Sequence, residues 1–231
     1  MSEKTYTLTK KELNLEKNKC IARFASIASH DLKNVVAGLS NISYFLNKSI
    51  KIETPTQEKM LGLLSSEVIT LNNRISELLD MTRVKQVKRE ICDLKDSLQK
   101  ALDASKVDGI TFDANLQSAK IYGDVEKLSQ VFFNIIKNAK DALDNTGTVK
   151  IDVSSDENNV SVVVSDTGKG MDEETLDQCF DPMFSTKTAK AVGMGLTVAQ
   201  QIIEMHNGTV KIISAPSKGT TVTVILPLLK D

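Results

Sequence analysis

The sequence predicts an α+β protein that consists of an N-terminal antiparallel two-helix hairpin and a C-terminal α/β sandwich. Up to about Thr82, apolar residues alternate four and three positions apart, which is the spacing of helices packed against other helices. From about Arg89 this spacing gives way to short alternating runs separated by helical patterns, which is typical of a sheet covered by helices. We therefore predict two domains, residues 1–88 and residues 89–231.

Length and composition limit the class of protein. The chain has 231 residues, 41% of them hydrophobic, and a formal net charge of -1, so its charge does not favour nucleic acid or an anionic membrane as a partner. Its three cysteines show no paired spacing, which is typical of reduced thiols in a cytosolic protein. No apolar run approaches the roughly 20 residues of a membrane span, and the N-terminus is too polar for a signal peptide. We expect a cytoplasmic protein with no membrane segment in this sequence.

The first predicted helix runs to about Asn47 and carries one apolar stripe. The stripe consists of Ile21, Ala25, Ala28, Leu32, Val35, Leu39, Ile42 and Leu46. His30 lies two residues after Ala28, about 200° around the helix, so its imidazole points away from the stripe into solvent. Asn34 lies one turn later on the same face. Taken alone, such a histidine is most simply interpreted as a solvated surface residue.

A second helix is predicted to begin at Pro55. Thr54 is its N-cap, and Gln57, three residues after the cap, completes a capping box. A second apolar stripe follows, formed by Leu61, Leu64, Val68, Leu71, Ile75, Leu78 and Thr82. A hairpin of two such helices cannot bury its stripe alone, so we predict a homodimer that closes a four-helix bundle. Packing of the hairpin on the second domain is the alternative.

In the second domain, Asp93 and Asp124 each precede a helical pattern and are predicted to be N-caps. Two alternating strands flank a polar turn, with the apolar residues Val149, Ile151 and Val153 on one strand and Val160, Val162 and Val164 on the other. A loop-rich region from Asp166 to Gly195 leads to a helix that ends near His206, and two more strands follow. We predict one mixed sheet with helices on one face.

Four short motifs in this domain indicate a nucleotide site. Asn134 and Asn138 lie on one helix face, where a neutral carboxamide oxygen can hold Mg²⁺ beside a triphosphate. The run Asp-Thr-Gly-Lys-Gly at residues 166–170 offers a carboxylate to an exocyclic amine while the backbone stays close to a base. Phe-Asp-Pro-Met-Phe follows at residues 180–184. Gly-Met-Gly-Leu at residues 193–196 opens a helix whose N–H groups can meet phosphates. Each motif alone also has an ordinary explanation as a turn or a helix start.

In this order, Asn-x-x-x-Asn, Asp-x-Gly-x-Gly, Phe-x-Pro-x-Phe and Gly-x-Gly-Leu resemble the ATP site of histidine kinases, Hsp90-type chaperones, type II topoisomerases and MutL proteins. The run Ser-His-Asp-Leu-Lys-Asn at residues 29–34 resembles the phospho-acceptor box of sensor histidine kinases. That family is therefore the closest match. The resemblance covers the chain from about Ile21 onward and implies a sandwich of the histidine-kinase and Hsp90 ATPase type.

For the second domain, the resemblance implies that ATP and Mg²⁺ bind there. Asn138 would ligate Mg²⁺, Asn134 would support both the phosphates and the metal, and Lys137 would reach the phosphates. Asp166 would accept a hydrogen bond from the adenine amine. The other residues expected to contact ATP are Gly168, Gly170, Gly193, Gly195 and Leu196. The resemblance assigns no catalytic role to His206.

For the first domain, the resemblance implies that His30 accepts the γ-phosphoryl group of ATP. Asp31 would be the base or orienting group for the imidazole. The phosphoryl group would then pass to an aspartate of a response regulator, and Asn34 would position water for dephosphorylation of that partner.

The chain departs from the family pattern at two places. Ala191-Val192 replaces a Gly-Thr pair at the end of the expected lid, which predicts a stiffer lid with one phosphate contact fewer, and Val35 replaces the usual proline after Asn34. Two other functions remain open on the sequence. One is a phosphotransfer scaffold with weak or lost ATP binding. The other is a chaperone-type or mismatch-repair-type ATPase, which would not need His30.

Overall fold

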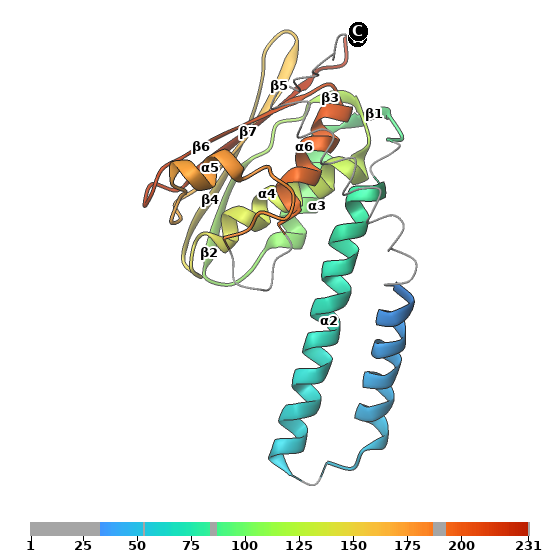
Figure 1. The fold of residues 1–231 in the computed structure, drawn as a ribbon. Helices are drawn as coiled ribbons and strands as arrows, with labels where there is room; N and C mark the ends of the chain where they lie inside the picture. The colour runs from blue at the N-terminus through green and yellow to red at the C-terminus, as the bar shows by residue number, and fades with distance from the viewer. Residues whose placement is uncertain (1–32, 53, 84–86, 187–192, 231) are drawn as a thin grey trace, which may run out of the picture. The chain divides into compact units, whose positions relative to one another are not determined.

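The computed structural model of the chain describes residues 33–52, 54–83, 87–186 and 193–230 (Figure 1). The N-terminal unit ends at Arg83, and the described residues from 87 onward form a second, larger unit. His30 and Asp31 lie outside the described residues. The predicted boundary between residues 88 and 89 stays a prediction. No helix among the described residues is both long and apolar enough to span a membrane.

Two helices make up the N-terminal unit, one over residues 33–49 and α2 over Pro55–Arg83. The predicted start of α2 is confirmed. The backbone N–H of Thr54 donates to Gln57 Oε1 at 3.0 Å, and the N–H of Gln57 donates to Thr54 Oγ1 at 3.3 Å. This reciprocal pair is the capping box that the sequence predicts.

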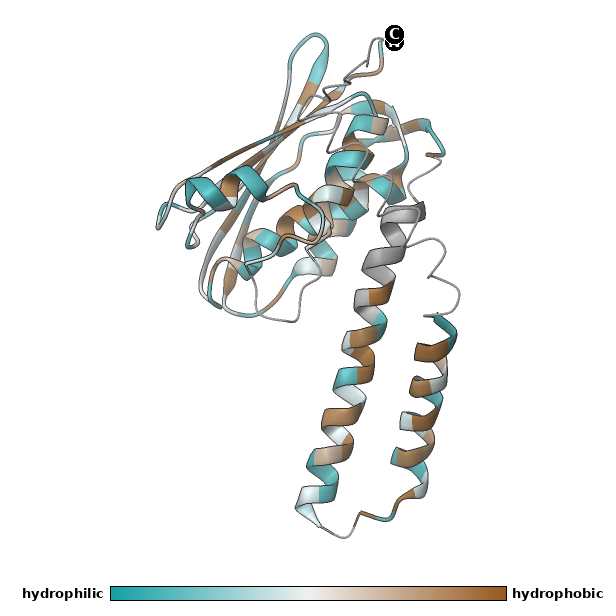
Figure 2. Cartoon of the chain, in the orientation of Figure 1, coloured by the Kyte–Doolittle hydropathy of each residue, from teal (hydrophilic) through white to brown (hydrophobic). Residues whose placement is uncertain are grey.

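The hairpin uses only part of its apolar surface to join its two helices. Among the residues of this unit whose burial the structure describes, the buried ones are Val36, Ser43, Leu61, Val68 and Ile75. On the first helix these are the neighbours of the predicted stripe, whereas the stripe residues Val35, Leu39 and Ile42 are exposed. Figure 2 shows apolar residues along both helices. Because two helices touch along a narrow seam, a wider stripe keeps one side uncovered.

The larger unit is built on a five-stranded sheet with the order β2-β4-β5-β7-β6. Its strands are β2 (Ile110–Asn115), β4 (Gly147–Ser155), β5 (Asn159–Asp166), β6 (Thr209–Ser214) and β7 (Thr220–Pro227). Strands β2 and β4 are parallel, and the remaining neighbours are antiparallel.

The prediction of a single sheet was wrong for two short strands. β1 (Glu90–Asp93) and β3 (Lys120–Gly123) pair with each other in a separate two-stranded sheet. Each is four residues long and leads directly into a helix, since Asp93 caps α3 (Leu94–Ser105) and Asp124 caps α4 (Val125–Asp141).

Helices α3, α4 and α6 (Gly195–Met205) lie on one face of the sheet, as predicted (Figure 1). The inner face of α4 is fully buried through Leu128, Val131, Phe132, Ile135 and Ile136. It meets the six predicted strand residues of β4 and β5, which are buried as well. The sequence missed one element, the short helix α5 (Glu173–Gln178), inside the region expected to be loop.

Candidate nucleotide-binding site

Asp166 is the last residue of β5 and is only 9% exposed. Its Oδ1 accepts hydrogen bonds from the backbone N–H of Gly168 at 2.8 Å and of Thr220 at 3.3 Å. Within the described residues, no group donates to the second oxygen, Oδ2. Burial raises the pKa of this carboxyl, while the two backbone donors partly oppose the rise. The side chain is thus held by one oxygen and offers the other as an acceptor for an amine N–H.

Glycines shape the loop after Asp166 because the chain comes very close to its neighbours there. At Gly170 the φ angle is +66°, and a Cβ atom would lie 1.9 Å from the carbonyl oxygen of Ala215. At Gly168 a Cβ atom would lie 2.4 Å from the carbonyl oxygen of Ala142. No side chain fits at either position, so the side of the candidate site next to Asp166 is formed by backbone.

A serine and a threonine that the sequence analysis did not select support Asp166. Ser214 Oγ accepts from the N–H of Met171 at 2.9 Å and lies 2.9 Å from both the carbonyl oxygen of Gly219 and Thr220 Oγ1. These contacts fasten the turn between β6 and β7 to the loop after Asp166. The available signal was a pair of hydroxyl residues flanking the Pro-Ser-Lys-Gly turn at the two strand ends.

The predicted metal and phosphate residues Asn134, Lys137 and Asn138 lie on α4 and are half-buried. Asn134 Nδ2 donates to the carbonyl oxygen of Gly195 at 3.1 Å, which joins α4 to the first turn of α6. A Cβ atom at Gly195 would make only ordinary contacts, the nearest at 3.6 Å from Asn134 Cγ. Neither backbone strain nor crowding requires a glycine there, and its absent side chain leaves the start of α6 open to a ligand.

The N-terminus of α6 has the features of an anion site. Its N-cap residue, Met194, makes no side-chain capping bond, so the first N–H groups, including those of Gly195 and Leu196, have no side-chain cap. Gly193 adopts φ +74°, and its carbonyl oxygen accepts from the N–H of Met183 at 3.1 Å. Thr197 Oγ1 donates to the carbonyl oxygen of Phe180 at 3.0 Å. The Phe-x-Pro-x-Phe run is therefore bonded to the start of α6.

These parts border one region of the larger unit. Asn134 connects α4 to α6, and the N–H of Lys169 donates to the carbonyl oxygen of Ala142, just beyond α4, at 3.1 Å. The predicted residues from α4, from the loop after β5 and from the start of α6 are thereby linked. Asn34 lies in the other unit and is exposed on the helix over residues 33–49. The lid residues Lys187 and Lys190 lie outside the described residues.

The side chains at this site suit a cation that is held mainly by the phosphates of a ligand better than one that is held by the protein alone. The described residues contain no group of three or more His, Cys, Asp or Glu side chains that could hold a metal ion. A hard cation at this site would depend on amide oxygens and on oxygens of the ligand itself, which is how proteins commonly hold Mg²⁺ with nucleotides.

Residues 123–230 match the family model described as histidine kinase-, DNA gyrase B- and HSP90-like ATPase. This part of the chain is therefore an ATPase domain of that family, and the match includes Asp166 and both asparagines of α4.

Matches to whole proteins extend beyond residues 123–230 and indicate the class of protein more closely. Sensor histidine kinase ZraS of Klebsiella oxytoca is 31% identical over 220 residues, a match that covers 92% of this chain and 47% of ZraS. The chain is thus homologous to sensor histidine kinases and spans about half the length of the curated relatives it matches.

Solved structures of histidine kinases share the fold. Full-length ShkA in complex with AMPPNP superposes with a TM-score of 0.76 at 18% identity, covering 90% of this chain and 46% of ShkA. Histidine kinase ThkA in complex with the response regulator protein TrrA gives 0.63 at 19% identity, covering 94% of this chain and 64% of ThkA. Both matches extend over the helical hairpin as well as the sandwich, so the predicted fold class is confirmed.

Proposed function

We propose that this chain is the catalytic core of a protein histidine kinase that transfers the γ-phosphoryl group of ATP to His30. The observation that carries this proposal is the buried Asp166 carboxylate, which is held by one oxygen and presents the other beside a wall of glycine backbone. This arrangement suits the exocyclic amine of adenine. The relatives named sensor histidine kinase and sporulation kinase, and a structural neighbour solved with AMPPNP, support it.

Each part of the site has a separate task in this proposal. Asp166 Oδ2 accepts a hydrogen bond from the adenine amine, and the glycine loop packs against the base. The N–H groups of Gly195 and Leu196, together with Asn134 and Lys137, hold the phosphates. Asn138 contributes its carboxamide oxygen to Mg²⁺, which neutralises phosphate charge when bound. Such charge neutralisation and in-line placement are the main requirements of phosphoryl transfer.

The chemical step proposed for the N-terminal unit is a displacement at phosphorus. One imidazole nitrogen of His30 bonds to the γ-phosphorus of ATP, the bond from that phosphorus to the bridging oxygen breaks, and ADP leaves. Asp31 holds or accepts the proton on the other ring nitrogen. The phosphoryl group then passes to an aspartate of a response regulator, a class of partner seen with ThkA. Asn34, which is exposed and lies four residues after His30 in the sequence, is proposed to position water for dephosphorylation of that regulator.

We further propose that the chain works in the cytoplasm, where ATP is available, and as a homodimer. The exposed apolar residues of the hairpin support a dimer: Val35, Leu39 and Ile42 on the first helix and Leu64 and Leu71 on α2. Closing a four-helix bundle would bury this surface.

The test is incubation of the wild type and His30→Gln with γ-labelled ATP and Mg²⁺. Label that is acid-labile, alkali-stable and missing from the variant is expected. Equal labelling of both proteins would favour a chaperone-type or repair-type ATPase. A wild-type protein that neither takes up label nor binds ATP would favour a phosphotransfer scaffold.

A further inference from the structure

Away from the nucleotide residues, the opposite ends of α4 and α6 meet. The two helices pack against each other, and the bond from Asn134 to Gly195 joins the middle of α4 to the first turn of α6. At the other end, the N-terminus of α4 meets the C-terminus of α6. Asp124 and Asn134 are ten residues apart on one helix, or roughly 15 Å.

His206 joins the two helix ends. It is 3% exposed, and its Nδ1 lies 2.7 Å from the carbonyl oxygen of Ile202, while the backbone N–H of Asp124 donates to Nε2 at 3.0 Å. Because a backbone N–H can only donate, Nε2 is the acceptor and Nδ1 carries the proton. The ring is therefore neutral. Burial lowers its pKa, the hydrogen bond to Ile202 raises it, and the Arg89 guanidinium and the Asp124 carboxylate lower and raise it, respectively.

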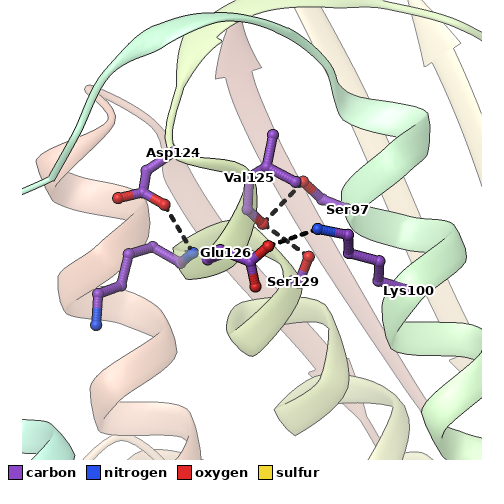
Figure 3. A network of polar contacts seen from close by, with 7 residues as sticks. Ser97, Lys100, Asp124, Val125, Glu126 and Ser129 are labelled. Atoms are coloured by element: carbon purple, nitrogen blue, oxygen red, sulfur yellow. Dashed lines mark hydrogen bonds and ion pairs between the residues drawn. The ribbon is translucent and has the colours of Figure 1, made fainter.

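Residues 88 and 89 bond to the same two helix ends. The N–H of Lys88 donates to Asp124 Oδ2 at 3.0 Å, while Asp124 Oδ1 caps α4 by accepting from the N–H of Lys127 at 3.1 Å. Figure 3 shows Asp124 at this end of α4. The Arg89 guanidinium donates to the carbonyl oxygen of Met205. That carbonyl belongs to the last turn of α6, where backbone acceptors lack helical partners and a cation is favoured.

We propose that Arg89, Asp124 and His206 form a clasp that positions α4 and α6 for nucleotide binding, so that ATP affinity depends on how residues 88 and 89 are bonded. This inference rests on the proposed function and adds a means of regulating it. Arg89 is a positioning residue, since it acts on the site only through α6. A change in the chain just before residue 88 would alter the bonds of residues 88 and 89 to the helix ends. Because α4 and α6 are packed together, it would also change the positions of Asn134 and Gly195.

Arg89→Met removes the bond to Met205, and Arg89→Lys restores a cationic donor. Lys100→Met is the matched control. Lys100 lies on α3, and its Nζ pairs at 2.5 Å with Oε1 of Glu126 in the first turn of α4 (Figure 3). This variant therefore also removes a cation that bonds near the N-terminus of α4, but not one that bonds to α6. The measurement is the dissociation constant of a fluorescent ATP analogue, with the melting temperature recorded without nucleotide. Arg89→Met is expected to raise that constant roughly fivefold, and the other two variants to stay within about twofold of the wild type.

Three results would overturn the clasp. They are unchanged affinity in Arg89→Met, equal weakening in Lys100→Met, and no recovery in Arg89→Lys. If the wild type binds no nucleotide, the proposed function fails and this inference fails with it. Wild-type binding that is unaffected by Arg89→Met overturns the inference alone.

A second measurement does not depend on the folding of Arg89→Met. Gln at position 206 keeps an acceptor near the place of Nε2 but does not protonate. As the pH is lowered below about 6.5, the wild-type affinity should fall more steeply than that of His206→Gln, because a protonated ring no longer accepts from Asp124. Parallel pH profiles would contradict the clasp.

Discussion

The two units of this chain differ in how much of their apolar surface they bury by themselves. In the larger unit, Phe132 is 0% exposed and lies on α4, a helix that packs against α3, α6 and the sheet. In the hairpin, Ile42 is 56% and Phe45 is 62% exposed. Exposed large side chains that recur at helical spacing mark a surface that another helix covers. The comparison indicates that the sandwich buries its core within one copy, whereas the described part of the hairpin exposes the apolar surface on which the proposed homodimer rests.

The largest expected effect is on the free energy of unfolding, when the same Phe-to-Ala substitution is made in each unit. Phe132→Ala should lower the free energy of unfolding of the larger unit by about 3–5 kcal/mol, because it leaves a cavity in a closed core. Phe45→Ala should leave that transition unchanged. Chemical denaturation followed by circular dichroism would measure the free energy of unfolding of both variants. Similar losses in the two variants would contradict the difference in burial between the two units.

The next effect concerns dimerisation. Ile42→Lys together with Leu71→Lys places a charge on both helices of the exposed stripe, which should weaken the dimer by roughly 3 kcal/mol or about 100-fold. Ser66→Lys adds one such charge about 200° around α2 from Leu64 and should leave the dimer intact. Sedimentation velocity would distinguish the two proteins. A dimer that persists in the double variant would place the interface elsewhere.

Asp166→Asn separates stability from function within the larger unit. The folded-state pKa of Asp166 is raised, so at pH 7 ionisation of the buried carboxyl opposes folding, and Asn removes that cost while its Oδ1 still accepts from Gly168. The melting temperature without nucleotide should stay the same or rise. ATP affinity should fall by roughly 1.5–3 kcal/mol, because a charged acceptor is lost. A variant that melts early would show that the carboxylate is structural.

His206 gives the smallest expected effect. Its folded-state pKa is lowered, so its contribution to stability is complete above about pH 6.5 and is lost as the pH falls through the folded-state value. Unfolding measurements on the larger unit should show this decline in the wild type. The decline should be smaller in His206→Gln, and identical profiles would mean that the ring does not titrate on unfolding.

Much of the fold could be predicted because local signals set it. Thr54, Asp93 and Asp124 cap helices where the sequence places them, and the valines of β4 and β5 occupy the buried face. Strand pairing depends on distant contacts, so nothing local separated β1 and β3 from the main sheet. The helix α5 is only six residues long and shows no apolar period, although Asp172 followed by Thr175 was an available cap signal.

In the candidate site, too, the residues in local motifs could be predicted, and those that depend on distant contacts could not. Asp166 and the glycines were found because short motifs carry them. Thr220 and Ser214 were missed because they reach Asp166 only when β5, β6 and β7 come together. Arg89 and His206 are 117 residues apart in the sequence, and no local pattern indicates that both bond to the end of α6.

The most direct test of the account compares His30→Gln and Asp166→Asn in two assays on the whole chain, ATP-analogue binding and acid-labile labelling from ATP. We predict that His30→Gln binds nucleotide like the wild type and takes up no label, whereas Asp166→Asn binds nucleotide more weakly and takes up less label. This result would place the nucleotide pocket in the sandwich and the phosphoryl acceptor in the hairpin. Labelling that survives in His30→Gln, or nucleotide binding that survives undiminished in Asp166→Asn, would contradict the account.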